Sequence, residues 1–265
     1  MYHSIADEPE TGVSAYYRTA TSPEIFGQHM QLLKSAGYQA VDLKTAVTAL
    51  QRGIKEKIAV VTFDDGYRNF YAAAFPILQQ LAFTATMFLP TAFIGKDHRT
   101  FKLRECMTWS EVQELHRAGI HFGSHTVTHP KLVELNWEQI KTELRDSKAE
   151  IESQLGVAAD TFAYPFAFPE TNSAFVNRLS ETLAETGYTC CATTRVGRAK
   201  PGDDLMQLKR LPANSCDDAK LFRAKLAGAY DWIAPLQSGV KKIKSVISPR
   251  RHNSSSEASR KEAHV

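Results

Sequence analysis

Residues 57–67 read K-I-A-V-V-T-F-D-D-G-Y, an apolar run that leads directly into two adjacent aspartates and a glycine. The run from Lys57 to Phe63 is rich in β-branched residues and predicts a buried strand. Asp64 and Asp65 then lie at the carboxyl end of that strand. The pair alone is also typical of a plain turn, because Asp and Gly tolerate left-handed backbone and Asp side chains bond to nearby amides.

A second motif follows about sixty residues later, where residues 124–130 read S-H-T-V-T-H-P. The preceding stretch, residues 120–123, also predicts a strand. His125 and His129 are four positions apart, which places both imidazoles on one side of a helical turn and within reach of one cation. This spacing alone is a weak signal, because it also occurs on ordinary helix faces. Placement strengthens it, since catalytic groups of barrel-like α/β folds gather at C-terminal strand ends.

Two histidines and one aspartate would form a facial set of ligands for a divalent cation, with water in the open position. One aspartate of the pair can then be a ligand. The other can take a proton from a water molecule whose pKa the cation lowers. The two motifs together therefore predict hydrolytic chemistry.

TFDDGY followed by SHTVTH resembles the first two motifs of the polysaccharide deacetylase family, carbohydrate esterase family 4, whose shared unit is the NodB homology domain. Similar segments extend over roughly residues 1–230 and include 26–38, 84–95, 109–115 and 162–166. The resemblance implies an α/β fold, a distorted and incomplete (β/α) barrel. It also implies that Asp64 is the general base, that the backbone N–H of Phe166 polarises the scissile carbonyl, and that the metal ligands are Asp65, His125 and His129.

The third motif departs from the family pattern. Many members carry Arg-x-Pro-Tyr-Gly, whereas residues 163–167 here read A-Y-P-F-A. The arginine that elsewhere pairs with the catalytic base is therefore missing at this point. Arg210 could supply the cation from another strand end, and the alternative is that it is an exposed strand charge.

The family's usual Leu-x-His motif near the C-terminus is also absent. In a circularly rearranged, exopolysaccharide-type subgroup that strand lies at the N-terminus as a Tyr-His pair, and this chain opens Met1-Tyr2-His3. The resemblance therefore makes His3 the candidate general acid. The alternative is a frayed terminal histidine without a role.

The resemblance implies a hydrolase that removes N-acetyl groups, in preference to O-acetyl groups, from a carbohydrate during assembly of a bacterial surface polysaccharide. Two imidazoles and one carboxylate favour Zn²⁺, and the same set accepts Co²⁺ or Ni²⁺. Two alternatives remain open: an amidohydrolase of the same fold acting on a non-sugar amide such as a cyclic ureide, and a catalytically decayed saccharide-binding protein. Four aromatic residues could be platforms for sugar rings, although such residues more often pack in the core: Tyr67, Trp109, Tyr164 and Phe166.

Length and composition fit one catalytic domain. The chain has 265 residues, of which 43% are apolar and 23% charged, enough for a full barrel core. It lacks the ~18 uninterrupted apolar residues of a membrane helix and the start of a standard signal peptide. We therefore expect a cytoplasmic protein, with a place at the inner face of the membrane as the alternative. Reduced thiols are expected because no C-x-x-C spacing occurs among Cys106, Cys190, Cys191 and Cys216.

The rest of the chain alternates between helix and strand patterns, which predicts a parallel sheet. Alternation alone would equally allow an open, doubly wound sheet, and closure into a barrel is what the resemblance adds. Besides the two strands above, we expect strands at 84–89, 162–165, 189–193 and 207–211. Helices are expected at 23–36, 43–52, 69–81, 110–118, 137–155, 172–186 and 217–229.

The composition changes near residue 239. We divide the chain into a catalytic domain at 1–235 and a basic, disordered tail at 236–265, with seven Lys or Arg between 241 and 261. The tail supplies the whole net charge of +3, so the domain has no basic face and we expect no nucleic-acid partner. The tail could hold the protein weakly at anionic lipid. The expected partner is an N-acetylated saccharide, which could be lipid-linked.

Overall fold

The computed structural model describes residues 1–54 and 56–231, with only the backbone of Tyr16. The predicted domain boundary at 235 and the basic tail lie outside these residues. The helices are α1 (Pro23–Ser35), α2 (Leu43–Gln51), α3 (Phe75–Gln80), α4 (Trp109–Arg117), α5 (Trp137–Leu155), α6 (Ser173–Glu185) and α7 (Ala219–Ala227). Short 3₁₀ turns are η1 (Ala15–Tyr17), η3 (Thr91–Phe93), η4 (Leu132–Glu134) and η5 (Leu205–Gln207), and η2 (Phe70–Ala74) is a π-helix.

Six strands form one parallel sheet in the order β12-β11-β10-β9-β6-β5, among the residues that the structure describes. The other strands form three separate pairs, β1–β2, β3–β4 and β7–β8. In chain order, all strands of the described residues are β1 (Ser4–Ile5), β2 (Ala20–Thr21), β3 (Gln39–Ala40), β4 (Ile58–Ala59), β5 (Thr62–Phe63), β6 (Thr86–Leu89), β7 (Thr100–Phe101), β8 (Arg104–Glu105), β9 (His121–Ser124), β10 (Thr161–Ala163), β11 (Cys190–Val196) and β12 (Leu208–Arg210).

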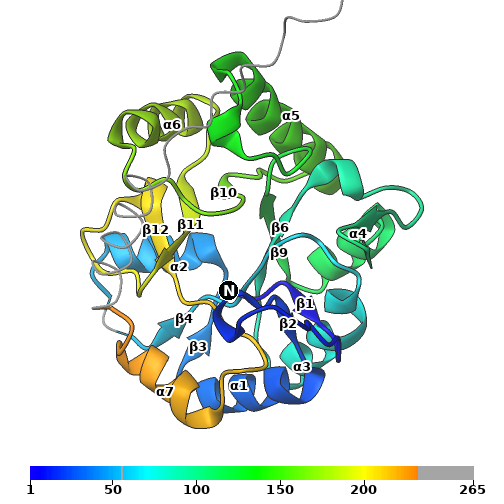
Figure 1. Cartoon of the computed structure of the whole chain (residues 1–265), viewed down its shortest axis with the longest axis vertical. Helices are drawn as coiled ribbons and strands as arrows, with labels where there is room; N and C mark the ends of the chain where they lie inside the picture. The colour runs from blue at the N-terminus through cyan, green and yellow to red at the C-terminus, as the bar shows by residue number, and fades with distance from the viewer. Residues whose placement is uncertain (55, 232–265) are drawn as a thin grey trace, which may run out of the picture.

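The six-stranded sheet winds in one direction. Its spatial order follows the order of the chain, with no reversal, and helices surround it in Figure 1. A doubly wound sheet would reverse its strand order at a switch point. The fold is therefore the expected incomplete α/β barrel, and the open-sheet alternative is wrong.

The first two residues bridge the two outer strands of this sheet. Tyr2 lies beside β5, and its N–H donates to the carbonyl oxygen of Thr62 at 2.8 Å. On the other side, the Met1 nitrogen donates to the carbonyl oxygen of Leu211 at 2.9 Å, and the Ala213 N–H donates to the Met1 carbonyl oxygen at 3.0 Å. The N-terminal segment thus spans the gap between the two outer strands, next to the residues that follow β5.

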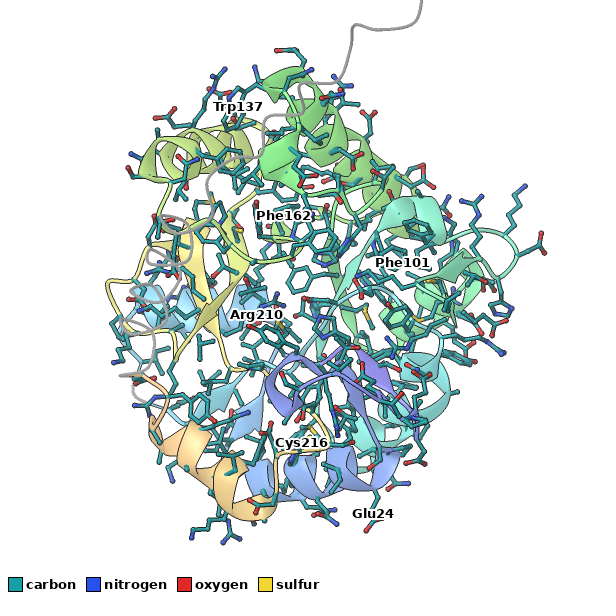
Figure 2. All side chains as sticks on the ribbon, in the orientation of Figure 1. Glu24, Phe101, Trp137, Phe162, Arg210 and Cys216 are labelled. Carbon is teal, nitrogen blue, oxygen red and sulfur yellow. The ribbon has the colours of Figure 1, made fainter. Side chains whose placement is uncertain are left out.

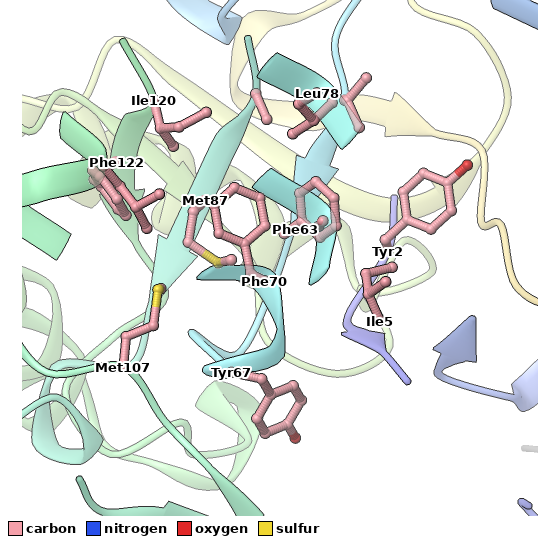
Figure 3. Packing of buried hydrophobic residues seen from close by; sticks show 14 of the residues in the cluster. Tyr2, Ile5, Phe63, Tyr67, Phe70, Leu78, Met87, Met107, Ile120 and Phe122 are labelled. Carbon is pink, nitrogen blue, oxygen red and sulfur yellow. The ribbon is translucent and has the colours of Figure 1, made fainter. Parts of the chain in front are cut away.

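The main core lies beneath the carboxyl end of β5. Phe63 packs edge to face on Phe70, with ring centroids 4.6 Å apart, and both are fully buried. Figure 3 shows these rings close to Tyr2 and Met87. Each large apolar side chain buried in this way contributes about 1.5–3 kcal/mol. The strand end that carries the two aspartates therefore rests on a packed aromatic cluster.

Helix α5 has the predicted boundaries because its sequence contains both caps. The Asn136 side chain accepts from the Gln139 N–H, and the Gln139 side chain accepts from the Asn136 N–H, both at 3.0 Å. This is a capping box. Gly156, with φ of 69°, ends the helix in left-handed backbone. The helix faces the sheet with Ile140, Leu144 and Ile151.

Two local predictions differ from the structure, and one hairpin was not predicted. The strand expected at 57–63 is two short strands, because β4 pairs with β3 while β5 pairs with β6. The helix expected at 69–81 begins as a π-helix and becomes α-helical only at Phe75, next to Pro76, which has no N–H to donate to the preceding turn. The antiparallel hairpin of β7 and β8 was not predicted, because its strands are only two residues long.

Two expectations about the whole chain can be compared with the described residues. No helix among them combines the length and the apolar character that crossing a bilayer requires. The four cysteines are free thiols, as expected, and three of them are buried.

His29 is a buried imidazole of α1, held by two hydrogen bonds. The Tyr2 hydroxyl is 3.0 Å from Nδ1, and Nε2 is 2.7 Å from the carbonyl oxygen of Asp217, so Nε2–H donates to that carbonyl. The ring stacks on Phe222 with centroids 4.0 Å apart. Burial lowers the pKa of His29 below its usual 6.5, despite the opposing effect of Asp217. The fold therefore favours neutral His29.

We expect this histidine to make the fold sensitive to acid. The unfolded chain binds a proton on His29 more readily than the folded protein does, so stability is full above the unfolded pKa and is lost as the pH falls toward the folded pKa. His29→Gln should reduce the fall in thermal midpoint between about pH 7.5 and about pH 5.5. A wild-type fall in the variant would contradict this.

Candidate metal centre and active site

The two sequence motifs meet at one edge of the sheet. Asp64 and Asp65 follow the end of β5, and His125 follows the end of β9. Strand β6 lies between β5 and β9 and is parallel to both, so the carboxyl ends of all three point the same way. Both motifs therefore lie at C-terminal strand ends, as predicted.

The two histidines do not lie on a helix. Residues 125–130 form a loop in which Thr126 and His129 have left-handed backbone, with φ of 71° and 56°, so the predicted helical turn is wrong. The Thr126 hydroxyl accepts from the His129 N–H at 2.9 Å and donates to the His125 carbonyl oxygen. Glu143 of α5 accepts from the backbone N–H groups of Val127 and Thr128 at 2.7 and 2.9 Å. Side-chain hydrogen bonds thus bring the imidazoles together.

Asp65, His125 and His129 form a buried cluster. The Nε2 atoms of His125 and His129 lie 3.7 and 3.3 Å from Oδ1 of Asp65. One ligand atom from each residue lies within 4.8 Å of the others. Oδ1 of Asp65 is buried without a hydrogen-bond partner. Because an unpartnered buried oxygen is costly and faces two imidazole nitrogens here, the cluster fits a divalent cation.

The protonation states also suit metal ligands. Nδ1 of His125 lies 2.7 Å from the carbonyl oxygen of Ala163 and donates to it, which leaves the Nε2 lone pair facing Asp65. Burial lowers the pKa of His125 to about 4, so this imidazole is neutral. Burial raises the pKa of Asp65, but the close imidazole of His129 and the ammonium of Lys102 are among the groups that outweigh it and hold that pKa well below its usual range. The cluster is therefore an ionised carboxylate with a neutral imidazole beside it.

Arg210 is not an exposed strand charge, because it is buried against Asp64. Its NH1 and NH2 atoms lie 2.7 and 2.9 Å from the two carboxylate oxygens of Asp64, and its Nε donates to the carbonyl oxygen of Thr193 at 2.9 Å. Figure 2 shows Arg210 near the middle of the molecule. Burial raises the pKa of Asp64, but the opposite effect of Arg210 and the neighbouring histidines is larger. The net result is a pKa well below the usual range of an aspartate. A guanidinium from β12 thus pairs with Asp64, whereas the third motif supplies no arginine.

His3 lies in the site and is not frayed. Its Nε2 is 3.9 Å from Oδ2 of Asp64, and its side chain is 23% exposed. Burial lowers the pKa of His3 below 6.5, although Asp64 and Asp65 oppose this. The imidazole therefore lies beside Asp64. The pairing of Tyr2 with β5 fixes this position.

Three of the four predicted sugar platforms are buried. Tyr67, Trp109 and Tyr164 are 0%, 7% and 2% exposed, so none offers a face to solvent. Phe166 is 43% exposed and has left-handed backbone, with φ of 60°. Its ring packs on His129 with centroids 4.6 Å apart. Only Phe166 of the four remains a candidate contact for substrate.

A cavity of about 490 Å³ lies away from this cluster. Its lining is mostly apolar and comes from β4, β12, α2 and α7. It reaches Thr62 and Arg210 but none of the three candidate metal ligands. We place the chemistry at the cluster, because the cavity lining offers no comparable set of converging ligand atoms.

Two residues near the cluster carry no signal in the sequence. Glu143 is one of several acidic residues on α5, and only the structure shows that it holds the histidine loop. Lys102, at the turn between β7 and β8, reaches Oδ2 of Asp65 at 3.3 Å. Its position 37 residues after Asp65 gives no hint of this contact.

A sequence profile of the polysaccharide deacetylase family matches residues 51–190, just over half of the chain. The chain belongs to the polysaccharide deacetylase family. The match includes the candidate ligands and Asp64 but neither His3 nor Arg210. The structure brings both residues, which the sequence had offered as candidates, to Asp64.

Known proteins agree with this assignment. The chain is 29% identical over 213 residues to YxkH of Bacillus subtilis (strain 168), named as a polysaccharide deacetylase, with 80% of this chain and 69% of YxkH covered. It is 29% identical over 136 residues to the poly-β-1,6-N-acetyl-D-glucosamine N-deacetylase of Escherichia coli (strain K12), covering 47% of this chain and 20% of that protein. The Streptococcus pyogenes deacetylase PplD, solved with acetate, has a TM-score of 0.72 and 25% identity, with 85% of this chain and 95% of PplD covered.

Proposed function

We propose that this polysaccharide deacetylase is a divalent-metal-dependent hydrolase that removes N-acetyl groups from a saccharide of a bacterial surface polysaccharide. One observation carries the proposal: three converging ligand residues lie next to a buried carboxylate that an arginine holds in place. The Escherichia coli relative, named as an N-deacetylase of a poly-N-acetylglucosamine, supports an N-acetyl rather than an O-acetyl substrate.

Asp65, His125 and His129 would hold the metal, and Zn²⁺ suits two imidazoles and one carboxylate. When bound, a divalent cation supplies a Lewis acid that lowers the pKa of water and polarises the acetyl carbonyl. The buried position of all three side chains supports a permanent site, because it leaves their polar atoms few other partners.

Asp64 is the proposed general base, which takes the proton from the attacking water. Its low pKa keeps it ionised at every working pH, at the cost of weaker basicity. Arg210 fixes the carboxylate through two hydrogen bonds and so sets the direction from which the proton arrives. Because Asp64 holds a proton weakly, it readily returns one to a better acceptor.

His3 is the proposed general acid, which gives a proton to the departing nitrogen. At neutral pH the C–N bond breaks slowly unless the departing nitrogen is first protonated, because an unprotonated amine is a poor leaving group. The backbone N–H of Phe166 is the proposed hydrogen-bond donor to the carbonyl oxygen as negative charge develops there. The exposed ring of Phe166 is the proposed contact with the sugar.

Metal binding is tested directly. Protein purified without chelator and then offered Zn²⁺ should bind one equivalent, and His125→Ala should bind almost none. His121→Ala is the matched control, since His121 precedes the same loop but has a 49% exposed side chain that faces Asp42. Elemental analysis after gel filtration measures both. A wild-type content no higher than that of His125→Ala would overturn the assignment.

The substrate is tested by acetate release from N-acetylated oligosaccharides, O-acetylated oligosaccharides and a cyclic ureide. We expect release from the N-acetylated glycans with metal-loaded protein and none from His125→Ala. Turnover of the ureide alone would support the amidohydrolase alternative. Glycan binding without any turnover would support a saccharide-binding protein.

A further inference from the structure

The two carboxylate oxygens of Asp65 have different surroundings. Oδ1 faces the two imidazoles and has no hydrogen-bond partner. Oδ2 accepts from the Tyr67 hydroxyl at 3.0 Å and lies 3.3 Å from Nζ of Lys102. The protein thus holds one oxygen and leaves the other open.

Tyr67 is placed for this contact by the turn after β5. Asp65 and Gly66 both have left-handed backbone, with φ of 74° and 66°, which turns the chain so that the Tyr67 side chain returns to Asp65. Figure 3 shows the Tyr67 hydroxyl pointing away from the other labelled core residues. The hydroxyl is thus placed to donate to Oδ2 of Asp65.

The hairpin of β7 and β8 also holds the Tyr67 ring in place. The Arg104 guanidinium lies over the Tyr67 ring, 5.3 Å from its centroid, and its Nε binds Glu8 at 2.6 Å. Tyr67 itself forms a β-bridge with Cys106, directly after the hairpin. The ring of Tyr67 is thus fixed on two sides.

The turn of this hairpin contains two residues in left-handed backbone, and one of them, Lys102, contacts Asp65. Lys102 and Leu103 both have positive φ, 48° and 66°, where Asn-Gly pairs are favoured. Left-handed backbone is unfavourable for each such residue, because Cβ crowds the following carbonyl oxygen. Leu103 is 98% exposed, so its own packing does not offset this cost, whereas Lys102 contacts both Asp65 and the rings of Phe101 and Phe166.

We propose that Tyr67 is a positioning residue of the metal centre, assisted by Lys102: together they hold Oδ2 of Asp65 so that Oδ1 alone binds the cation. The proposal rests on the metal site above. It assigns Tyr67 a structural task at the metal in place of the sugar contact predicted from the sequence. Outer hydrogen bonds of this kind typically change metal affinity by about 10–100-fold.

Tyr67→Phe tests the proposal, because it removes one hydroxyl and keeps the buried ring. Tyr71→Phe is the matched control, since the Tyr71 hydroxyl also donates to a carboxylate, Glu114, at 2.9 Å but belongs to the helical segment after the site. Zn²⁺ affinity is measured by competition with a chromophoric chelator. We expect Tyr67→Phe to bind about 10–100-fold more weakly than wild type, and Tyr71→Phe to match wild type.

Two further readouts separate positioning from general damage. The thermal midpoint without metal should be similar in Tyr67→Phe and Tyr71→Phe, whereas the visible absorption spectrum of the Co²⁺-loaded protein should change only in Tyr67→Phe. An unchanged spectrum together with wild-type Zn²⁺ affinity in Tyr67→Phe would overturn the inference. Failure of the wild-type protein to bind metal would instead overturn the proposed function.

The shared role of Lys102 is tested with a double-mutant cycle. In Tyr67→Phe, Lys102 still holds Oδ2, so the loss of Zn²⁺ affinity caused by Tyr67→Phe should be larger in a Lys102→Met background. The charge effect of Lys102→Met alone cancels in this comparison. Leu103→Ser, at the exposed neighbouring position, should show no such coupling. Additive effects of Tyr67→Phe and Lys102→Met would remove Lys102 from the proposal.

Discussion

Asp64→Asn should lower deacetylation by about 10²–10⁴-fold and leave Zn²⁺ affinity near wild type, because it deletes a proton acceptor and not a ligand. Asp65→Asn should weaken Zn²⁺ binding itself, since Oδ1 of Asp65 faces both histidines. Turnover with saturating metal and Zn²⁺ affinity, measured on both variants, separate the two aspartates. Equal loss of metal in both would show that the roles are wrongly assigned or that both carboxylates are ligands.

Asp64→Asn needs a control for folding, because it leaves the buried Arg210 cation without its partner. Breaking a buried ion pair from one side costs about 3–5 kcal/mol. The double variant Asp64→Asn/Arg210→Met removes both charges and should recover much of the thermal stability. It should remain as inactive as the single variant. Recovered activity in the double variant would mean that Asp64 matters only as a partner of Arg210.

His3→Gln should lower deacetylation by about two orders of magnitude while metal content and thermal midpoint stay near wild type. The side chain is partly exposed, whereas the neighbouring Tyr2 makes the contacts that anchor the N-terminal segment. Turnover, metal content and a thermal scan on the same preparation measure the three quantities. Wild-type turnover would leave the general acid unassigned.

The pH–rate profile gives a second test of His3. A general acid must be protonated, so activity should fall as the pH rises through the pKa of His3. Because burial lowers that pKa below 6.5, this alkaline limb should begin at a lower pH than for an ordinary exposed histidine. His3→Gln should lack the limb. An unchanged limb in the variant would assign it to another group.

Much of the site was predictable because its chemistry is local in sequence. Each motif joins an apolar strand to polar residues at its carboxyl end, and parallel strands bring such ends to one edge. Asp64, Asp65, His125 and His129 were therefore found without coordinates. The α5 boundaries were predictable for the same reason, since the residues that form both caps lie next to the helix ends in the sequence.

Contacts between distant segments could not be predicted in this way. Arg210 reaches Asp64 across 146 positions of sequence, and strand composition does not show which way its side chain points. The histidine loop looked helical because spacing reports neighbours on a helix, whereas here hydrogen bonds from Thr126 and Glu143 set the backbone. Aromatic residues near a motif also gave no indication of burial, which depends on what packs against them.

The sequence by itself indicated the family, most of the order of strands and helices, and the four residues that meet at the candidate site, because periodicity and motif spacing are properties of short segments. The tertiary structure decided what surrounds that centre: the guanidinium on Asp64, the imidazole of His3 beside it, and the Tyr67 hydroxyl on Oδ2 of Asp65. These contacts arise when the sheet curls and the N-terminal segment spans the gap between its two outer strands. Which residues form these contacts depends on packing between segments that are distant in sequence, and the pattern of residues within one segment contains no information about it.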